Sequence, residues 1–224
     1  MSTSHPAPRR RLLKLPGSDP TAPDNGLEPP FDPTSWTGAL TIMAGLAGLL
    51  YVVEAFDAAG GHRLDRFGLR PRMVDGLEGI VTAPFLHAGW WHLISNTGPF
   101  VLLGWVLLLS GLRTFLTVTA LVALIGGAAT WALAPAGLIV GVSGVIFGWL
   151  GYLIARAFFA RRVLWIVAAV LVAFFFSGLF AGLLPTLNSN VSWQGHVFGF
   201  AAGVFAGWLL HPRAPRRVRP ASVS

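Results

Sequence analysis

Long apolar runs separated by short polar links dominate the chain after residue 35. Six such segments are present, at residues 36–56, 90–110, 114–134, 138–155, 163–184 and 191–210. Each is close to the ~20 residues that a helix needs to cross a ~30 Å hydrocarbon core. The pattern therefore predicts an all-α membrane protein built as a bundle of six transmembrane helices.

The polar stretches divide the chain. Residues 1–35 are rich in proline and carry basic side chains, which predicts a disordered cytoplasmic tail. Residues 57–89 form the long connection, with Arg and Asp among apolar stretches, and we expect a structured loop at the membrane interface. Residues 211–224 form a second basic cytoplasmic tail, so the predicted domain covers residues 36–210.

Composition supports a membrane protein and excludes several kinds of functional site. Apolar residues make up 54% of the chain and charged residues 11%, with a mean hydropathy of +0.66. The absence of cysteine excludes disulfides, thiol nucleophiles and cysteine metal sites. The net charge of +7 belongs to tails and loops around apolar segments, so it does not indicate a nucleic-acid partner.

The acidic residues are confined to the first part of the chain. All 9 Asp and Glu residues precede Gly79, and the single lysine, Lys14, lies in the N-terminal tail. Paired-carboxylate chemistry, a Ser-His-Asp triad and a His-Glu metal site are therefore excluded from the last five segments. Catalysis inside the membrane would need a serine or threonine nucleophile with a histidine base. No metal or cofactor is predicted.

Basic residues predict the orientation. With the N-terminus inside, twelve of the 16 Lys and Arg residues are cytoplasmic, and the other four, Arg63, Arg66, Arg70 and Arg72, are outside. The excess of positive charge on one side predicts that both termini are cytoplasmic.

Two glycine patterns predict close packing between the fourth and sixth segments. Glycines three or four residues apart share a helix face and let a neighbouring backbone approach. The first set is Gly137, Gly141, Gly144, Gly148 and Gly151, and the second is Gly195, Gly199, Gly203 and Gly207. We take Gly141, Gly144, Gly199 and Gly203 as the packing residues.

Polar residues accompany these glycines. If both segments are helical, Ser143 and His196 each lie about six residues from the outer end, roughly 9 Å deep. His92 and Asn96 share one face at the outer end of the second segment. The alternative is structural: a serine filling a helix contact, a packed histidine, and a His–Asn pair bonding across helices.

Together these groups suit acyl transfer. A serine within hydrogen-bond reach of a histidine is a nucleophile with its general base. His92, Asn96 and the backbone N–H of Ser143 would supply donors to the developing oxyanion. Without a carboxylate, His196 has to be oriented by packing, and Phe147, one turn after Ser143, is placed to lie against its ring.

Three motifs resemble those of the rhomboid family of intramembrane serine proteases, and the resemblance covers roughly residues 36–210. They are His92-Leu93-Ile94-Ser95-Asn96, Gly141-Val142-Ser143-Gly144, and Gly195-His196 followed by Gly199 and Gly203. The resemblance implies Ser143 as nucleophile, His196 as base, and His92 and Asn96 in the oxyanion hole. His87 matches a loop histidine of structural role.

The chain also departs from the family pattern. Phe147 stands where many members have tyrosine, and Gly195 replaces the usual alanine. Glu78 and Gly79 stand where a Trp-Arg pair is common. These differences leave the expected dyad of Ser143 and His196 intact and affect the expected packing of the first loop.

We therefore expect a multi-pass protein of a bacterial cell membrane that cleaves transmembrane segments of other proteins near their outer ends. The expected partners are these substrates and the lipid bilayer, with small side chains around the cut. The alternatives are a catalytically silent rhomboid-like binding protein and a small transporter or channel. The transporter is disfavoured because this sequence shows no inverted repeats.

Overall fold

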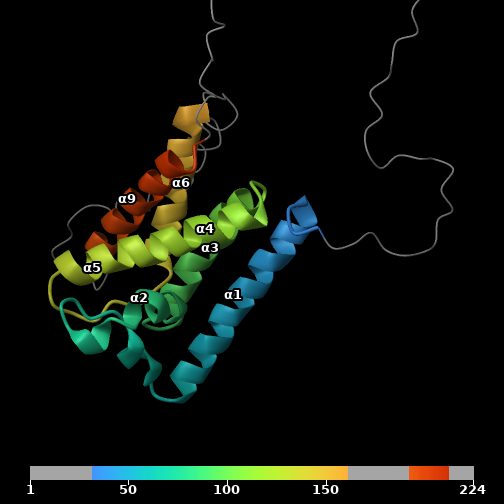
Figure 1. Cartoon of the computed structure of the whole chain (residues 1–224). Coiled ribbons are helices and arrows are strands. Elements are labelled where there is room, and N and C mark those ends of the chain that lie inside the picture. Colours follow the sequence, from blue (N-terminus) through green and yellow to red (C-terminus); the bar gives the residue numbers. More distant parts are fainter. Residues whose placement is uncertain (1–31, 161–191, 212–224) are drawn as a thin grey trace, which may run out of the picture. The chain divides into compact units, whose positions relative to one another are not determined.

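The computed structural model describes residues 32–160 and 192–211, and their regular secondary structure is helical apart from one isolated antiparallel bridge (Figure 1). The all-α prediction is confirmed over these residues. The main helices are α1 (Trp36–Ala59), α3 (Trp90–Leu108), α4 (Leu112–Leu121), α5 (Gly127–Leu133), α6 (Ser143–Ala160) and α9 (Trp193–Leu209). The predicted fifth segment, 163–184, lies outside the described residues, so the count of six helices stays a prediction.

Three helices within the described ranges are long and apolar enough to cross a membrane. They are Trp36–Ala59, Trp90–Leu108 and the continuous helical stretch Leu112–Leu133. A shorter apolar helix covers Ser143–Phe159. This content of apolar helices fits a multi-pass membrane protein.

Helix α1 is apolar on all sides and buries one stripe. Ser35 caps its first turn by accepting a hydrogen bond from the Gly38 N–H (3.0 Å). Buried residues recur every three or four positions, which places them on one face. They are Ala39, Met43, Ala47, Leu50, Glu54 and Asp57. Leu40, Leu49 and Phe56 are exposed on other faces, as expected for a helix that faces lipid.

The first loop folds into four short helical turns: η1 (Leu64–Phe67), η2 (Val74–Gly76), α2 (Gly79–Thr82) and η3 (Ala83–Phe85). Several hydrogen bonds tie this loop to later parts of the chain, among them the following. Leu69 and Ile139 exchange both backbone hydrogen bonds, each 2.9 Å long. The Trp131 indole N–H donates to the Met73 carbonyl (2.9 Å).

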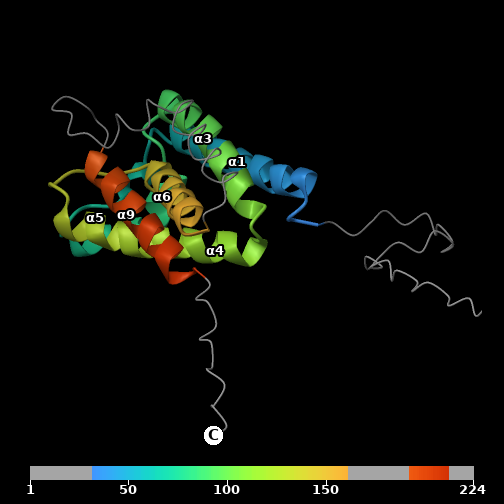
Figure 2. The same ribbon diagram turned by 90° about the horizontal axis from the view of Figure 1, so that it is seen from above.

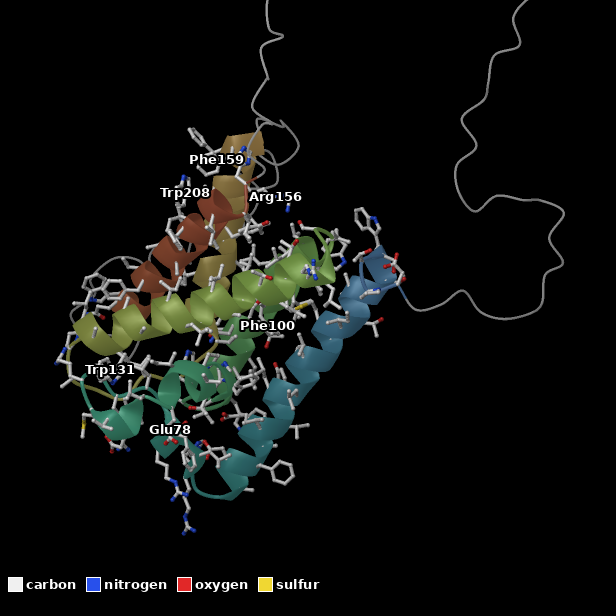
Figure 3. All side chains as sticks on the ribbon, viewed as in Figure 1. Glu78, Phe100, Trp131, Arg156, Phe159 and Trp208 are labelled. Atoms are coloured by element: carbon white, nitrogen blue, oxygen red, sulfur yellow. The ribbon has the colours of Figure 1, made fainter. Side chains whose placement is uncertain are left out.

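Helix α6 lies at the centre of the described bundle, with α3 and α9 on opposite sides (Figure 2). Residues 145–153 are nearly all buried. Trp149 anchors this packing: its indole N–H donates to Thr119 Oγ1 (3.0 Å), and its ring contacts Phe100 and Phe115. Figure 3 shows Phe100 in the interior, whereas Trp208 points away from the bundle.

Glycines allow α6 and α9 to meet backbone to backbone. A Cβ added at Gly199 would lie 3.0 Å from the Gly144 carbonyl carbon and closer still to its oxygen. A Cβ at Gly203 would likewise clash with the Gly148 carbonyl. The separation between these two helices is therefore set by the absence of side chains.

Two elements differ from the sequence prediction. Helix α6 begins at Ser143 rather than at residue 138, so the depth estimated from residue 137 does not hold for Ser143. Gly141 consequently lies in the preceding loop, and its assignment to the helix–helix contact is wrong. The third segment is one continuous helical stretch, but it contains a π-helical turn, η4 (Val122–Gly126), between α4 and α5.

Candidate active site

Ser143 is the first residue of α6 and follows a tightly held loop. Ile139 is fixed by its bridge to Leu69, and the Gly141 N–H donates to the Ala83 carbonyl (2.9 Å). Gly141 has a φ of +119°, a conformation that residues with a side chain rarely adopt. An added Cβ there would lie 2.7 Å from His92 Cε1. The loop therefore needs glycine at this position to bring Ser143 and His92 to the same place.

His196 approaches Ser143 from α9. Ser192 caps this helix, its Oγ accepting a hydrogen bond from the Gly195 N–H (3.3 Å). His196 lies in the first turn that follows and is buried, with 5% of its surface exposed. Its Nε2 is 2.8 Å from Ser143 Oγ, which is hydrogen-bond distance.

Phe147 covers one face of the His196 ring. The two ring centroids are 4.3 Å apart and the ring planes are inclined by 21°. Because Phe147 and Ser143 are separated by one turn of α6, the helix that carries the hydroxyl also restricts rotation of the imidazole.

His92 and Asn96 occupy different surroundings although they share one face of α3. The ring of His92 lines the same cavity as Ser143 and His196 and lies against Gly141. Asn96 is buried, and its amide donates to the backbone carbonyl of His92 (2.9 Å). Asn96 is not among the described residues that line the cavity.

His87 supports His92 from the loop before α3. Its ring meets that of His92 edge to face, with centroids 5.3 Å apart. Neither ring nitrogen has a hydrogen-bond partner among the described residues, and 1% of the residue is exposed. Burial, assisted by the neighbouring His92, lowers the pKa of His87 to about 4. His87 is therefore a neutral, packed side chain at ordinary pH.

The cavity has a volume of about 420 Å³ and is bounded mainly by small and apolar residues. Its walls come from the first loop, η4, α5, the loop before α6, and the first turns of α6 and α9. Two hydroxyl groups on this wall, those of Thr130 and Ser192, were not among the residues picked out from the sequence. A serine three residues before a helical glycine is a capping signal that could have pointed to Ser192.

This arrangement can perform nucleophilic chemistry. A neutral His196 can accept the Ser143 proton across their hydrogen bond. As the first residue of α6, Ser143 also has a backbone N–H without an acceptor inside the helix. That N–H and the His92 ring border the same cavity, so donors are available where negative charge would develop.

Comparison with known proteins gives one family match and several relatives. The model of the Rhomboid domain matches residues 75–213. An uncharacterised protein of Mycobacterium tuberculosis (strain ATCC 25618 / H37Rv) is 43% identical over 188 residues, covering 80% of this chain and 77% of the relative. An uncharacterised protein of Mycobacterium leprae (strain TN) is also 43% identical, over 80% of this chain and 73% of the relative. A Bacillus subtilis (strain 168) protein named "Putative rhomboid protease YdcA" is 29% identical over 140 residues, which cover 62% of this chain and 69% of the relative.

Proposed function

Since this chain belongs to the rhomboid family, we propose that it is a serine endopeptidase that cleaves transmembrane segments of other membrane proteins. The observation that carries the proposal is the 2.8 Å contact between Ser143 Oγ and His196 Nε2 on the wall of a cavity that also contains His92. We assign Ser143 as the nucleophile and His196 as the general base.

The first half-reaction acylates Ser143. Its Oγ attacks the substrate carbonyl carbon while His196 Nε2 takes the hydroxyl proton. The negative charge that develops on the carbonyl oxygen is stabilised by the Ser143 N–H and by His92. One N–H of the Asn96 amide is bonded to the His92 carbonyl, so Asn96 adds a donor to the oxyanion only if its second N–H reaches the cavity, which Asn96 does not line in the described structure.

His196 then completes the reaction. Its imidazolium gives the proton to the leaving amine, which departs as the new N-terminus. A water molecule attacks the acyl-enzyme, His196 accepts a proton from it, and the acid product leaves as Ser143 regains its hydroxyl proton. Stacking on Phe147 keeps the imidazole in position throughout both steps.

The cavity indicates what part of a substrate can react. A peptide bond inside a helix is shielded by its own hydrogen bonds, so the substrate has to unwind locally before it can enter. Gly126, Gly127, Gly195 and Gly199 are among the residues that line the cavity. These glycines leave room for extended backbone beside Ser143, and the family resemblance implies small side chains next to the cleaved bond.

The proposal includes the arrangement in the membrane. We infer six spans within residues 36–210, with the N-terminal tail 1–35 and the C-terminal tail 211–224 in the cytoplasm. The outer end of α1 and the first loop then lie on the opposite side, the same side as the cavity. This orientation rests on the excess of Arg and Lys in the segments assigned to the inside.

A fluorophosphonate probe tests the assignment, because such probes react with activated serines. We expect labelling at Ser143 in the wild-type protein and cleavage of a transmembrane reporter. Ser143→Ala should do neither, while its Tm stays close to that of the wild type. Thr41→Ala is the control, since Thr41 is exposed on α1 and does not line the cavity, and it should label and cleave. A folded wild-type protein that neither labels nor cleaves would instead be a silent binding relative.

A further inference from the structure

The buried stripe of α1 ends in two carboxylates rather than in apolar residues. Glu54 and Asp57 are each 1% exposed. Both carboxylate oxygens of Glu54, and Oδ2 of Asp57, are buried without a hydrogen-bond partner among the described residues. Leaving such groups unpaired is costly, because a buried charge needs a counter-charge or several hydrogen bonds.

Two residues of the first loop complete this group. His62 Nδ1 lies 3.4 Å from Asp57 Oδ2. One ligand atom each from Asp57, His62 and Asp65 falls within 4.8 Å of the other two. Glu54 precedes Asp57 by about one turn on the same buried stripe of α1, so its carboxylate lies on the side of the helix that carries Asp57. Oδ1 of Asp65 is a further buried oxygen without a hydrogen-bond partner in the described part of the chain.

The basic residues nearby do not neutralise these carboxylates. Arg66 lies over the ring of Phe67, 4.6 Å from its centroid, and Arg70 pairs with Asp75. Within the described residues, the exposed His62 is the one basic side chain within salt-bridge distance of the group. The group therefore has excess negative charge on its buried side.

We propose that Asp57, Asp65 and His62 bind a divalent cation at the outer end of α1, with Glu54 supplying additional negative charge beside it. The spacing suits such an ion. Two oxygens on opposite sides of Ca²⁺, each at about 2.3–2.6 Å, are about 5 Å apart, close to the 4.8 Å limit of this cluster. Carboxylates favour Ca²⁺ and Mn²⁺, and the imidazole adds a ligand that transition metals accept.

The cation would join two elements. Glu54 and Asp57 belong to α1, whereas Asp65 belongs to η1 of the first loop. Asp65 also lines the active-site cavity. Four residues later, Leu69 pairs with Ile139 in the loop before Ser143. Bound metal would therefore fix the cavity wall against α1. The sequence alone led us to expect no metal; the unpaired buried oxygens are the reason to propose one.

Thermal unfolding of the full-length protein in detergent tests the site without using its activity. After removal of metals with EDTA and buffer exchange, CaCl₂ and MnCl₂ are titrated separately. We expect at least one of them to raise the Tm in a saturable manner, because a ligand that binds only the folded state stabilises it. Asp65→Asn should weaken this binding by at least about tenfold. Asp75→Asn, a change to an exposed carboxylate of the same loop, should bind like the wild type.

Two further measurements keep the test decisive if Asp65→Asn folds poorly. Electron paramagnetic resonance of Mn²⁺ added to the wild-type protein should show one bound ion per chain, displaced by excess Ca²⁺. Glu54→Gln should raise the Tm of the metal-free protein, because it removes an unpaired buried charge, and should weaken metal binding. The proposal is overturned if neither ion changes the Tm, or if Asp65→Asn and the wild type respond alike. Because the readout is metal binding, the result is independent of whether Ser143 is catalytic.

Discussion

Replacing Gly199 by alanine tests whether the contact between α6 and α9 sets the position of Ser143 and His196, the proposed catalytic dyad. An added Cβ at residue 199 would be 3.0 Å from the carbonyl carbon of Gly144 and closer to the oxygen. The obstacle is backbone, so no side chain can move aside and the helices have to separate. Gly144 directly follows Ser143, and His196 lies one turn before Gly199, so separation acts directly on the dyad.

The expected magnitude follows from two opposing terms. Alanine favours a helix over glycine by about 1 kcal/mol. Overpacking a close contact costs about 1–3 kcal/mol. We therefore expect a net loss of up to about 2 kcal/mol in the free energy of unfolding. The effect on activity is larger, because a displacement of about 1 Å can cost about 100-fold in rate. Such a shift would stretch the 2.8 Å contact between Ser143 and His196 beyond hydrogen-bond distance.

The assay compares the reporter cleavage rate and Tm of three proteins purified in one detergent. Gly48→Ala is the control, since a Cβ at this position in α1 has no atom within 4 Å. It should cleave at the wild-type rate with an unchanged or higher Tm. If Gly199→Ala matched Gly48→Ala in both measurements, the backbone contact would not control the dyad, and the reasoning would be wrong.

Three further predictions concern groups around the cavity. His92→Ala is expected to lower turnover by about 10²–10³, with less effect on KM, as for loss of one oxyanion donor; an unchanged rate would make His92 a packing residue. Gly141→Ala should lower both activity and Tm, since its φ is +119° and its Cβ would meet His92, whereas Gly137→Ala, with open space around it, should be neutral in the same assays. The pKa of His87 is about 4 when folded, against about 6.5 when unfolded, so the unfolded chain binds more protons between these values and stability falls by roughly 3 kcal/mol as the pH drops from 6.5 to 4. His87→Gln should show a flatter pH dependence of unfolding, and an identical slope would contradict this origin.

Apolar length and glycine spacing predict much of the fold. The start of α1, the extent of α3 and the glycine faces of α6 and α9 follow from patterns that are local in sequence. The start of α6 does not. Residues 138–142 are as apolar as the helix that follows, so hydropathy cannot separate them from it. A contact 70 residues away, between Leu69 and Ile139, holds this stretch out of the helix.

The candidate site was likewise predicted only in part. Ser143, His196 and His92 can be selected because polar residues are rare in apolar segments, and the structure brings the three to one cavity. The bond from Asn96 to the His92 carbonyl could not be foreseen, because it depends on the rotamer of the amide. The group of Glu54, Asp57, His62 and Asp65 was also missed. In the sequence its members are divided between a helix end and a loop, and they meet only after α1 continues to Ala59.

The bridge between Leu69 and Ile139 has a consequence for how this protein can vary. Ser143, the proposed nucleophile, is positioned by two parts of the chain: the buried helix α6, which it begins, and the first loop, which holds the residues before it. The interior of α6 tolerates little change, because its residues are enclosed on nearly every side. Substitutions in the loop can instead adjust the position of Ser143 without disturbing the bundle. If the proposed function holds, the loop is the part of the molecule through which reaction rate and substrate preference can evolve separately from stability in the membrane.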